Sequence, residues 1–252
     1  MVWRVFAAAA VGSSHVQAGL PCQDAYAFQV VGDALVAAVC DGAGSAASSH
    51  VGAAVVSAAV VNEVASHLLS ARASGSKPWP ETVEEAYGWL RELLSEVRAQ
   101  LVRHAQAAES PLADFATTLV GVVTTPAGGW FFHVGDGVGV ADACDAGSTV
   151  SQPENGEYAN ETYFITGEDW ARHLRLLRIV APQRLALMSD GAASFVMGKG
   201  NQTLFAPFIT PVEKFLLATD ETSGSAALAR TLSDARTDRI TPDDKTLLLA
   251  YA

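Results

Sequence analysis

The stretch Leu-Val-Ala-Ala-Val-Cys-Asp-Gly-Ala-Gly-Ser-Ala, residues 35–46, contains the pattern that decides the fold. The uninterrupted apolar run Leu35–Cys40 is typical of a strand that is covered on both faces. It ends at Asp41-Gly42, a common turn dipeptide. Gly32-Asp33 separates it from a second apolar run, Tyr26–Val31, and two such runs around a short Gly-containing turn predict a β-hairpin.

Outward from this hairpin, strands and helices occur in blocks. Apolar residues at helical spacing predict helices over 45–69 and 81–107, which are joined by a Pro- and Ser-containing linker and pack antiparallel on one face of a sheet. Polar loops are expected over 12–24 and 142–161. Further strands are predicted at 2–11, 115–125, 130–134, 138–141, 162–166, 174–180, 184–189 and 245–251, and further helices after Asp190, near 212–217 and over 225–236. This order favours an α+β fold of packed, largely antiparallel sheets with helices outside.

Length and composition indicate a folded protein. The 252 residues are 50% apolar and 17% charged, which is enough to form a core, and we expect one domain over residues 1–252. The formal net charge of −11 argues against a nucleic-acid or anionic-membrane surface, since both need clustered Lys and Arg.

Cysteine and hydropathy patterns point to a cytoplasmic protein. The three cysteines lack C-x-x-C spacing, so neither a disulfide framework nor a zinc site is indicated. No apolar stretch reaches the ~18–20 residues of a membrane helix. Residues 1–11 resemble a short signal peptide, but a buried first strand is the favoured interpretation.

Aspartates recur where apolar runs begin or end: Asp24, Asp41, Asp136, Asp190 and the pair Asp243-Asp244. A single Asp-Gly is usually only a turn. Together, however, these carboxylates can meet at one end of a sheet, and the first four have no Lys or Arg within two residues. Such a cluster repels itself unless a cation lies at its centre, and an all-oxygen ligand set favours Mg²⁺ or Mn²⁺.

Six short segments resemble, in the same order, the motifs of the metal-dependent Ser/Thr protein phosphatase family, type 2C. They are GSSHVQAGLPCQDA (12–25), VCDGAGSA (39–46), TTLVG (117–121), HVGDG (133–137), LMSDG (187–191) and DDKTL (243–247). The CQDA form and GEYANET (156–162) are similar to its compact bacterial branch. The resemblance implies a four-layer αββα sandwich of two mainly antiparallel sheets.

The resemblance also implies the site. Asp41 matches the aspartate that bridges two metal ions, and Gly42 would offer its carbonyl to one of them. Asp24, Asp190 and Asp243 match the remaining metal-site aspartates, and Asp136 matches the residue that helps to hold a weaker third ion. The implied activity is Mg²⁺- or Mn²⁺-dependent hydrolysis of phosphoserine and phosphothreonine in proteins by a metal-activated water, opposing a bacterial Ser/Thr kinase. Cys22 would not be a nucleophile.

Two positions depart from the family pattern. Gly19 stands where the family usually has a phosphate-binding arginine, and Ala43 stands where eukaryotic members have a candidate acid, histidine. His15 is our candidate for the missing phosphate contact, and a loop histidine that binds backbone is the alternative. We expect His133 to be a core histidine and His50, His67 and His104 to be surface or interhelical, while Glu157, Tyr158 and Asn160 are candidates for a substrate-facing surface.

Two other functions remain open. A catalytically weak pseudophosphatase, acting as a phosphoprotein-binding or regulatory module, is favoured by the missing arginine and disfavoured by the four retained aspartates. The second alternative is a two-metal phosphodiesterase that acts on nucleic acid or a nucleotide. The net charge and the lack of a basic strip disfavour a polymeric substrate for such an enzyme.

Overall fold

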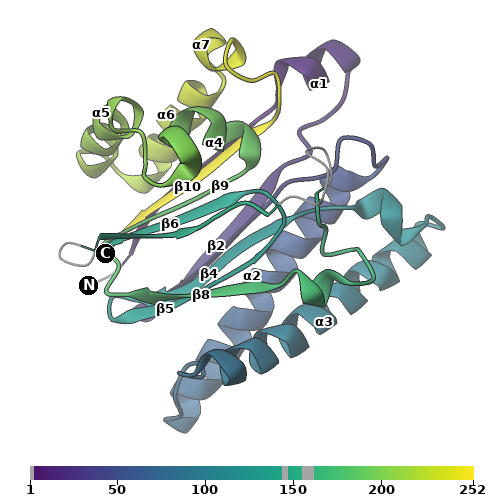
Figure 1. The fold of residues 1–252 in the computed structure, drawn as a ribbon, viewed down its shortest axis with the longest axis vertical. Coiled ribbons are helices and arrows are strands. Elements are labelled where there is room, and N and C mark those ends of the chain that lie inside the picture. Colours follow the sequence, from purple (N-terminus) through teal and green to yellow (C-terminus); the bar gives the residue numbers. More distant parts are fainter. Residues whose placement is uncertain (1–2, 144–146, 155–161) are drawn as a thin grey trace.

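The computed structural model describes residues 3–143, 147–154 and 162–252, and it confirms the αββα sandwich. Two five-stranded sheets pack face to face, with helices on both outer faces (Figure 1). One sheet has the order β1 (Arg4–Ala10), β10 (Lys245–Tyr251), β9 (Arg184–Met188), β6 (Val138–Ala143) and β7 (Gly147–Ser151). The other has the order β2 (Ala25–Val31), β3 (Ala34–Cys40), β4 (Leu119–Thr125), β5 (Gly128–Val134) and β8 (Arg175–Val180). The strand pairs are antiparallel.

The predicted hairpin strand β3 shows why the sandwich forms. All its residues are buried, because successive side chains point to opposite faces and both faces are covered. Leu35, Ala37 and Val39 join the core between the two sheets. The alternate residues Val36, Ala38 and Cys40 join a second core beneath the long helices. The apolar run is therefore explained by burial on both sides.

Helices cover each sheet on its outer face. Helices α2 (Ser49–Ser74) and α3 (Val83–Ala107) lie over the β2–β8 sheet, side by side as expected. The other sheet is covered by α4 (Asp190–Val196), α5 (Ala206–Leu217) and α6 (Glu221–Leu232). The remaining helical segments are short: α1 (Ser13–Ala18), α7 (Ala235–Asp238), η1 (Leu112–Phe115), η2 (Trp170–Arg172) and η3 (Lys199–Asn201).

By length and composition alone, α2 is apolar enough to cross a membrane, and it is the one such helix among the described residues. No membrane-spanning segment was expected from the sequence. Its apolar window is 56% buried within the protein. Val56, Val60 and Val64 are buried in the core against the sheet. We therefore interpret α2 as a core helix.

Four local predictions were wrong. Residues 12–24 contain helix α1, and residues 147–151 form the edge strand β7, where loops were expected. Residues 163–169 are irregular instead of a strand. The predicted linker begins later, because α2 continues to Ser74 and ends at Gly75 in the left-handed conformation (φ 68°).

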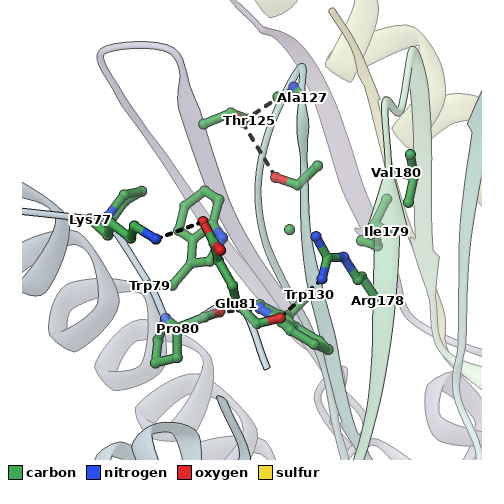
Figure 2. Close-up of a pocket in the computed structure, with 13 residues that line it drawn as sticks. Lys77, Trp79, Pro80, Glu81, Thr125, Ala127, Trp130, Arg178, Ile179 and Val180 are labelled. Atoms are coloured by element: carbon green, nitrogen blue, oxygen red, sulfur yellow. Dashed lines mark hydrogen bonds and ion pairs between the residues drawn. The ribbon is translucent and has the colours of Figure 1, made fainter. Parts of the chain in front are cut away.

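The α2–α3 linker is fixed at the end of the sheet opposite to Asp41, where β4 turns into β5 (Figure 2). The Trp130 indole N–H donates to the Pro80 carbonyl at 3.0 Å. Arg178 donates to the Glu81 carbonyl at 3.0 Å and lies over the Trp130 ring. A cavity of about 230 Å³ lies beside these residues. These contacts hold the start of α3 against β5 and β8.

Two helix glycines provide a test of this packing. A Cβ atom at Gly52 of α2 would lie 2.1 Å from the Phe115 carbonyl oxygen, whereas one at Gly88 of α3 would meet nothing within 4 Å. We expect Gly52→Ala to lower the free energy of unfolding by ~1–3 kcal/mol through overpacking. The matched variant Gly88→Ala should raise it by ~0.5–1 kcal/mol, because alanine favours the helix. Chemical denaturation measures both values, and equal effects would contradict this account of the α2–η1 contact.

Candidate active site

The sandwich brings the predicted aspartates to one end. Asp24 immediately precedes β2 and Asp41 immediately follows β3, so antiparallel pairing puts them side by side. Asp136 lies between β5 and β6, Asp190 is the first residue of α4, and Asp243 lies just before β10. The carboxylates therefore come from five separate segments of the chain. For this reason the recurrence of aspartates at strand ends indicates the site, whereas no single motif does.

Most of these residues line a single cleft of about 300 Å³. The lining comprises Gln23, Asp41, Gly42, Ala43, Gly44, Ser45, Thr118, Asp136, Thr162, Phe164, Asp190 and Asp243. Four aspartates are among them, and none of the lining residues is Lys, Arg or His. The cleft is therefore a strongly negative environment without a cation of its own.

Asp24 lies beneath this cleft and is 7% exposed. Its Oδ2 accepts a hydrogen bond from the Ser189 hydroxyl at 2.7 Å, whereas Oδ1 is buried without a hydrogen-bond partner among the described residues. Burial raises the pKa of Asp24 to about 7, and the neighbouring Asp244 and Asp190 carboxylates add to the effect.

Asp41 and Asp190 interact directly. Their carboxyl groups are close enough to share a hydrogen bond. Desolvation, followed by the charge of Asp24 and then that of Asp190, raises the pKa of Asp41 well above its usual range. Desolvation also raises the pKa of Asp190, and the charges of Asp136 and Asp243 act in the same direction. Both shifts mean that the ionised forms of these two carboxyl groups are disfavoured where no cation lies beside them.

The donor set fits hard divalent cations. It consists of carboxylate oxygens, the orphaned Asp24 Oδ1 and the buried Gln23 Oε1, which also lacks a described partner. A Cβ atom at Gly42 would lie 2.6 Å from the Gln23 carbonyl oxygen, so only glycine allows the backbone to come this close. Among the described residues, no group of three or more His, Cys, Asp and Glu side chains is already arranged to hold a metal ion. The carboxylates would therefore have to move together around bound ions.

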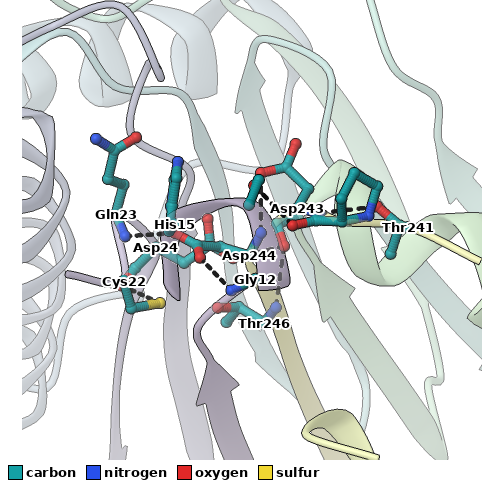
Figure 3. Close-up of polar contacts among 12 residues, drawn as sticks. Gly12, His15, Cys22, Gln23, Asp24, Thr241, Asp243, Asp244 and Thr246 are labelled. Carbon is teal, nitrogen blue, oxygen red and sulfur yellow. Dashed lines mark hydrogen bonds and ion pairs between the residues drawn. The ribbon is translucent and has the colours of Figure 1, made fainter. Parts of the chain in front are cut away.

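The half-buried His15 and the buried Asp244 form a pair beside this cluster (Figure 3). The His15 Nδ1 atom lies 2.9 Å from Asp244 Oδ2. His15, the sequence-based candidate for the phosphate contact, therefore lies beside the aspartate cluster but does not line the cleft itself, and its role stays a prediction. In the sequence, Asp244 is only the neighbour of Asp243, and no pattern assigns it a role. In an extended segment the two side chains point to opposite sides, and the sequence does not show which one faces the cleft.

The two departures from the family pattern have simple local settings. Gly19 ends α1 in the left-handed conformation (φ 68°), and a Cβ atom there would meet nothing within 4 Å. Residue 19 is thus an exposed helix cap. Ala43 lies in the cleft lining, where its methyl group cannot donate a proton.

The remaining candidates divide as follows. His133 is fully buried with Nδ1 2.9 Å from the Ser151 hydroxyl, and burial lowers its pKa well below the usual range, which confirms a core histidine. His67 contacts Trp89 between α2 and α3, and His104 contacts Phe115.

Burial raises the pKa of Cys22 to about 12, so a reactive thiolate is disfavoured. Glu157, Tyr158 and Asn160 lie outside the described residues.

The raised pKa of Asp24 predicts how stability depends on pH when chelator has removed divalent ions. The native carboxyl binds its proton more tightly than the unfolded one, so stability is greatest below the unfolded pKa and falls as pH rises through about 7. At ~1.4 kcal/mol per pKa unit, the change attributable to Asp24 is a few kcal/mol. Asp24→Asn should flatten this pH dependence in urea unfolding experiments. Equal slopes for the two proteins would contradict the assignment.

Comparison with known proteins agrees with this geometry. The family described as Protein phosphatase 2C matches residues 11–233. Serine/threonine-protein phosphatase 3 of Escherichia coli strain K12 is 31% identical over 259 residues, which cover 99% of this chain and 98% of that protein.

Two solved structures share the fold. One, a bacterial serine phosphatase, has a TM-score of 0.63 and 17% identity over 99% of this chain and 96% of its own. The other, the catalytic domain of the serine threonine protein phosphatase PstP in complex with 2 manganese ions, has a TM-score of 0.59 and 15% identity over 99% and 98%. Because the family match spans most of the sequence and the Escherichia coli relative matches nearly all of it, this chain belongs to the protein phosphatase 2C family.

Proposed function

We propose that this chain hydrolyses phosphoserine and phosphothreonine in protein substrates, with Mg²⁺ or Mn²⁺ held by the strand-end aspartates. The observation that carries the proposal is the cleft lined by four aspartates and by no Lys, Arg or His. Desolvation, to which neighbouring carboxylates add, raises the pKa of Asp41 and Asp190. A non-catalytic protein has no physical need for such a cluster, since carboxylates without a cation destabilise one another.

Each aspartate has a distinct place in the proposed centre. Asp41 would be shared by two ions, with the Gly42 carbonyl on one of them, and Asp190 and Asp243 would each hold one ion. Asp24 supports the pair from beneath, through the carboxylate that Ser189 fixes. Asp136, whose Oδ2 accepts a hydrogen bond from Thr162 at 2.7 Å, would hold a weaker third ion.

Bound ions of this kind act as Lewis acids and activate water for in-line attack on phosphorus, so no covalent enzyme intermediate is needed. The chain itself orients the substrate. His15 would contact a phosphate oxygen in place of the absent arginine, through the ring nitrogen that Asp244 does not occupy. Ala43, Gly44 and Ser45 form a rim of small side chains, which leaves room for a phosphorylated residue on a protein surface.

The biological setting follows from this chemistry. We propose one catalytic domain over residues 1–252 that acts in the cytoplasm on phosphoproteins and opposes a Ser/Thr kinase. The net charge of −11 disfavours polyanionic nucleic-acid substrates. The alternative, a regulatory module with weak turnover, is favoured by one observation: residue 19 is a glycine cap instead of an arginine.

Metal removal tests the proposal directly. Phosphatase activity toward p-nitrophenyl phosphate and a phosphothreonine peptide should vanish in EDTA and return with Mn²⁺ or Mg²⁺. Ca²⁺, with its larger coordination shell, should not restore it. The same ions should raise the melting temperature, because they bind the folded state only. Full activity in chelator would end the two-metal proposal, whereas Mn²⁺ binding without turnover would favour the regulatory module.

The second test ranks two aspartates of the cleft. Asp41→Asn should lose turnover by ~10³-fold or more, since activation of water by metal is worth several kcal/mol at ~1.4 kcal/mol per tenfold. It should also lose tight binding of at least one ion in calorimetry. The matched variant Asp136→Asn should keep two tightly bound ions, although turnover can still fall. If Asp41→Asn bound two ions normally and Asp136→Asn bound none, the ligand assignments would be wrong.

A further inference from the structure

The Asp244 carboxylate has three hydrogen-bond contacts beside the cleft, and the proposed reaction assigns it no role. It is 2% exposed, whereas the side chain of its neighbour Asp243 is open to the cleft. Asp244 Oδ1 accepts from the Gly12 N–H at 2.6 Å, and Oδ2 accepts from the Gln23 N–H at 2.5 Å. The third contact is His15 Nδ1, at 2.9 Å from Oδ2. Two backbone donors therefore fix the carboxylate in the orientation that meets the imidazole.

The segment that contains His15 is itself held against residues 242–244. The Ser14 N–H and hydroxyl both donate to the Pro242 carbonyl, at 3.0 and 2.7 Å. A Cβ atom at Gly12 would lie 2.3 Å from the Asp243 carbonyl carbon. The His15 side chain is only 13% exposed. Contacts at Gly12 and Ser14, immediately before His15, and the hydrogen bond of its own ring to Asp244 therefore set its position.

The hydrogen bond between His15 and Asp244 determines which ring nitrogen of His15 remains available to a substrate. Because Nδ1 is committed to Asp244, the nitrogen that remains for substrate is Nε2. Figure 3 shows this nitrogen pointing away from Asp244, toward the side on which the Gln23 amide lies. A ring with protons on both nitrogens donates to the carboxylate at Nδ1 and to a phosphate oxygen at Nε2. The buried carboxylate orients that ring, as an aspartate does for a catalytic histidine.

We infer that Asp244 is a positioning residue, which holds His15 so that its Nε2–H binds the phosphate of the substrate. The inference rests on the proposed phosphatase function and extends it. Recognition of the phosphoryl group then comes from a His–Asp pair between α1 and β10. In this arrangement Asp243 serves the metal ions and Asp244 serves the substrate, although the two residues are adjacent in sequence.

A double-mutant cycle with Mn²⁺-loaded protein tests the inference. The variants are His15→Ala, Asp244→Asn and the double variant, with KM and kcat for a phosphothreonine peptide and the inhibition constant of inorganic phosphate as readouts. Each single variant should raise KM and the phosphate inhibition constant by about tenfold to a hundredfold, as expected for a hydrogen bond to a charged group. Asp244→Asn in the His15→Ala background should change either constant by less than about threefold. Mn²⁺ affinity by calorimetry should stay at the wild-type value.

Two controls make the result decisive. His15→Gln places a neutral amide donor near the same site, so it should recover part of the phosphate affinity, and adding Asp244→Asn to it should have little further effect. Asp220→Asn changes a carboxylate that accepts the Ser223 N–H at 2.8 Å on the distant α6 and should leave all kinetic constants unchanged.

Additive losses in the cycle, or a loss of Mn²⁺ affinity in Asp244→Asn, would overturn the inference, because Asp244 would then act through the backbone or through Asp243. If Asp244→Asn is unstable, its lowered melting temperature will show this, and the two His15 variants then decide the question. An unchanged phosphate inhibition constant in both His15→Ala and His15→Gln overturns the inference. Failure of the proposed function is distinguishable, since the wild-type protein would then show no Mn²⁺-dependent hydrolysis.

Discussion

Mutual repulsion among clustered carboxylates is the constraint around which this end of the molecule is built. Desolvation raises the pKa of Asp24, Asp41 and Asp190, neighbouring carboxylates raise each of these values further, and the cleft lining supplies no positive side chain. Such an arrangement persists only because the apolar strands on either side are fixed by burial on both faces. The sandwich core thus stabilises a site that is unfavourable by itself, and a divalent cation is the simplest group to relieve it.

Close backbone approach is the second requirement. Cβ atoms at Gly12, Gly42 and Gly191 would lie 2.0–2.6 Å from backbone atoms of the Asp243-Asp244 or Gln23 segments. These glycines let loops from both sheets converge without side chains between them, so the aspartates and Asp244 meet although they come from distant parts of the sequence. The glycines of the Asp-Gly motifs at 42 and 191 are therefore packing requirements as well as turn residues.

Packed antiparallel sheets with outer helices, and aspartates at strand ends, could be predicted from local patterns: apolar runs for β3 and β10, and carboxylates where such runs begin or end. The four-layer αββα arrangement was implied only by the family resemblance. Prediction from local patterns failed where tertiary contact decides. Strand β7 has few apolar residues and forms because β6 pairs with it, and α1 forms within a polar segment that packs on Pro242. Asp244 could not be distinguished from Asp243, because only the folded chain shows which of two adjacent carboxylates meets Gly12, Gln23 and His15.

The glycine at position 19 and the histidine at position 15 are best understood as one structural change. A left-handed residue at the end of α1 favours glycine, and a larger side chain at φ 68° is disfavoured by ~1–2 kcal/mol. The six-residue helix that this cap ends begins at Ser13 and contains His15, which it holds against Asp244. An arginine at the exposed cap would be free to move, whereas the imidazole is held between buried groups. The absence of the arginine and the presence of a short capped helix are thus two aspects of one arrangement, in which His15, by our proposal, binds phosphate beside the carboxylates.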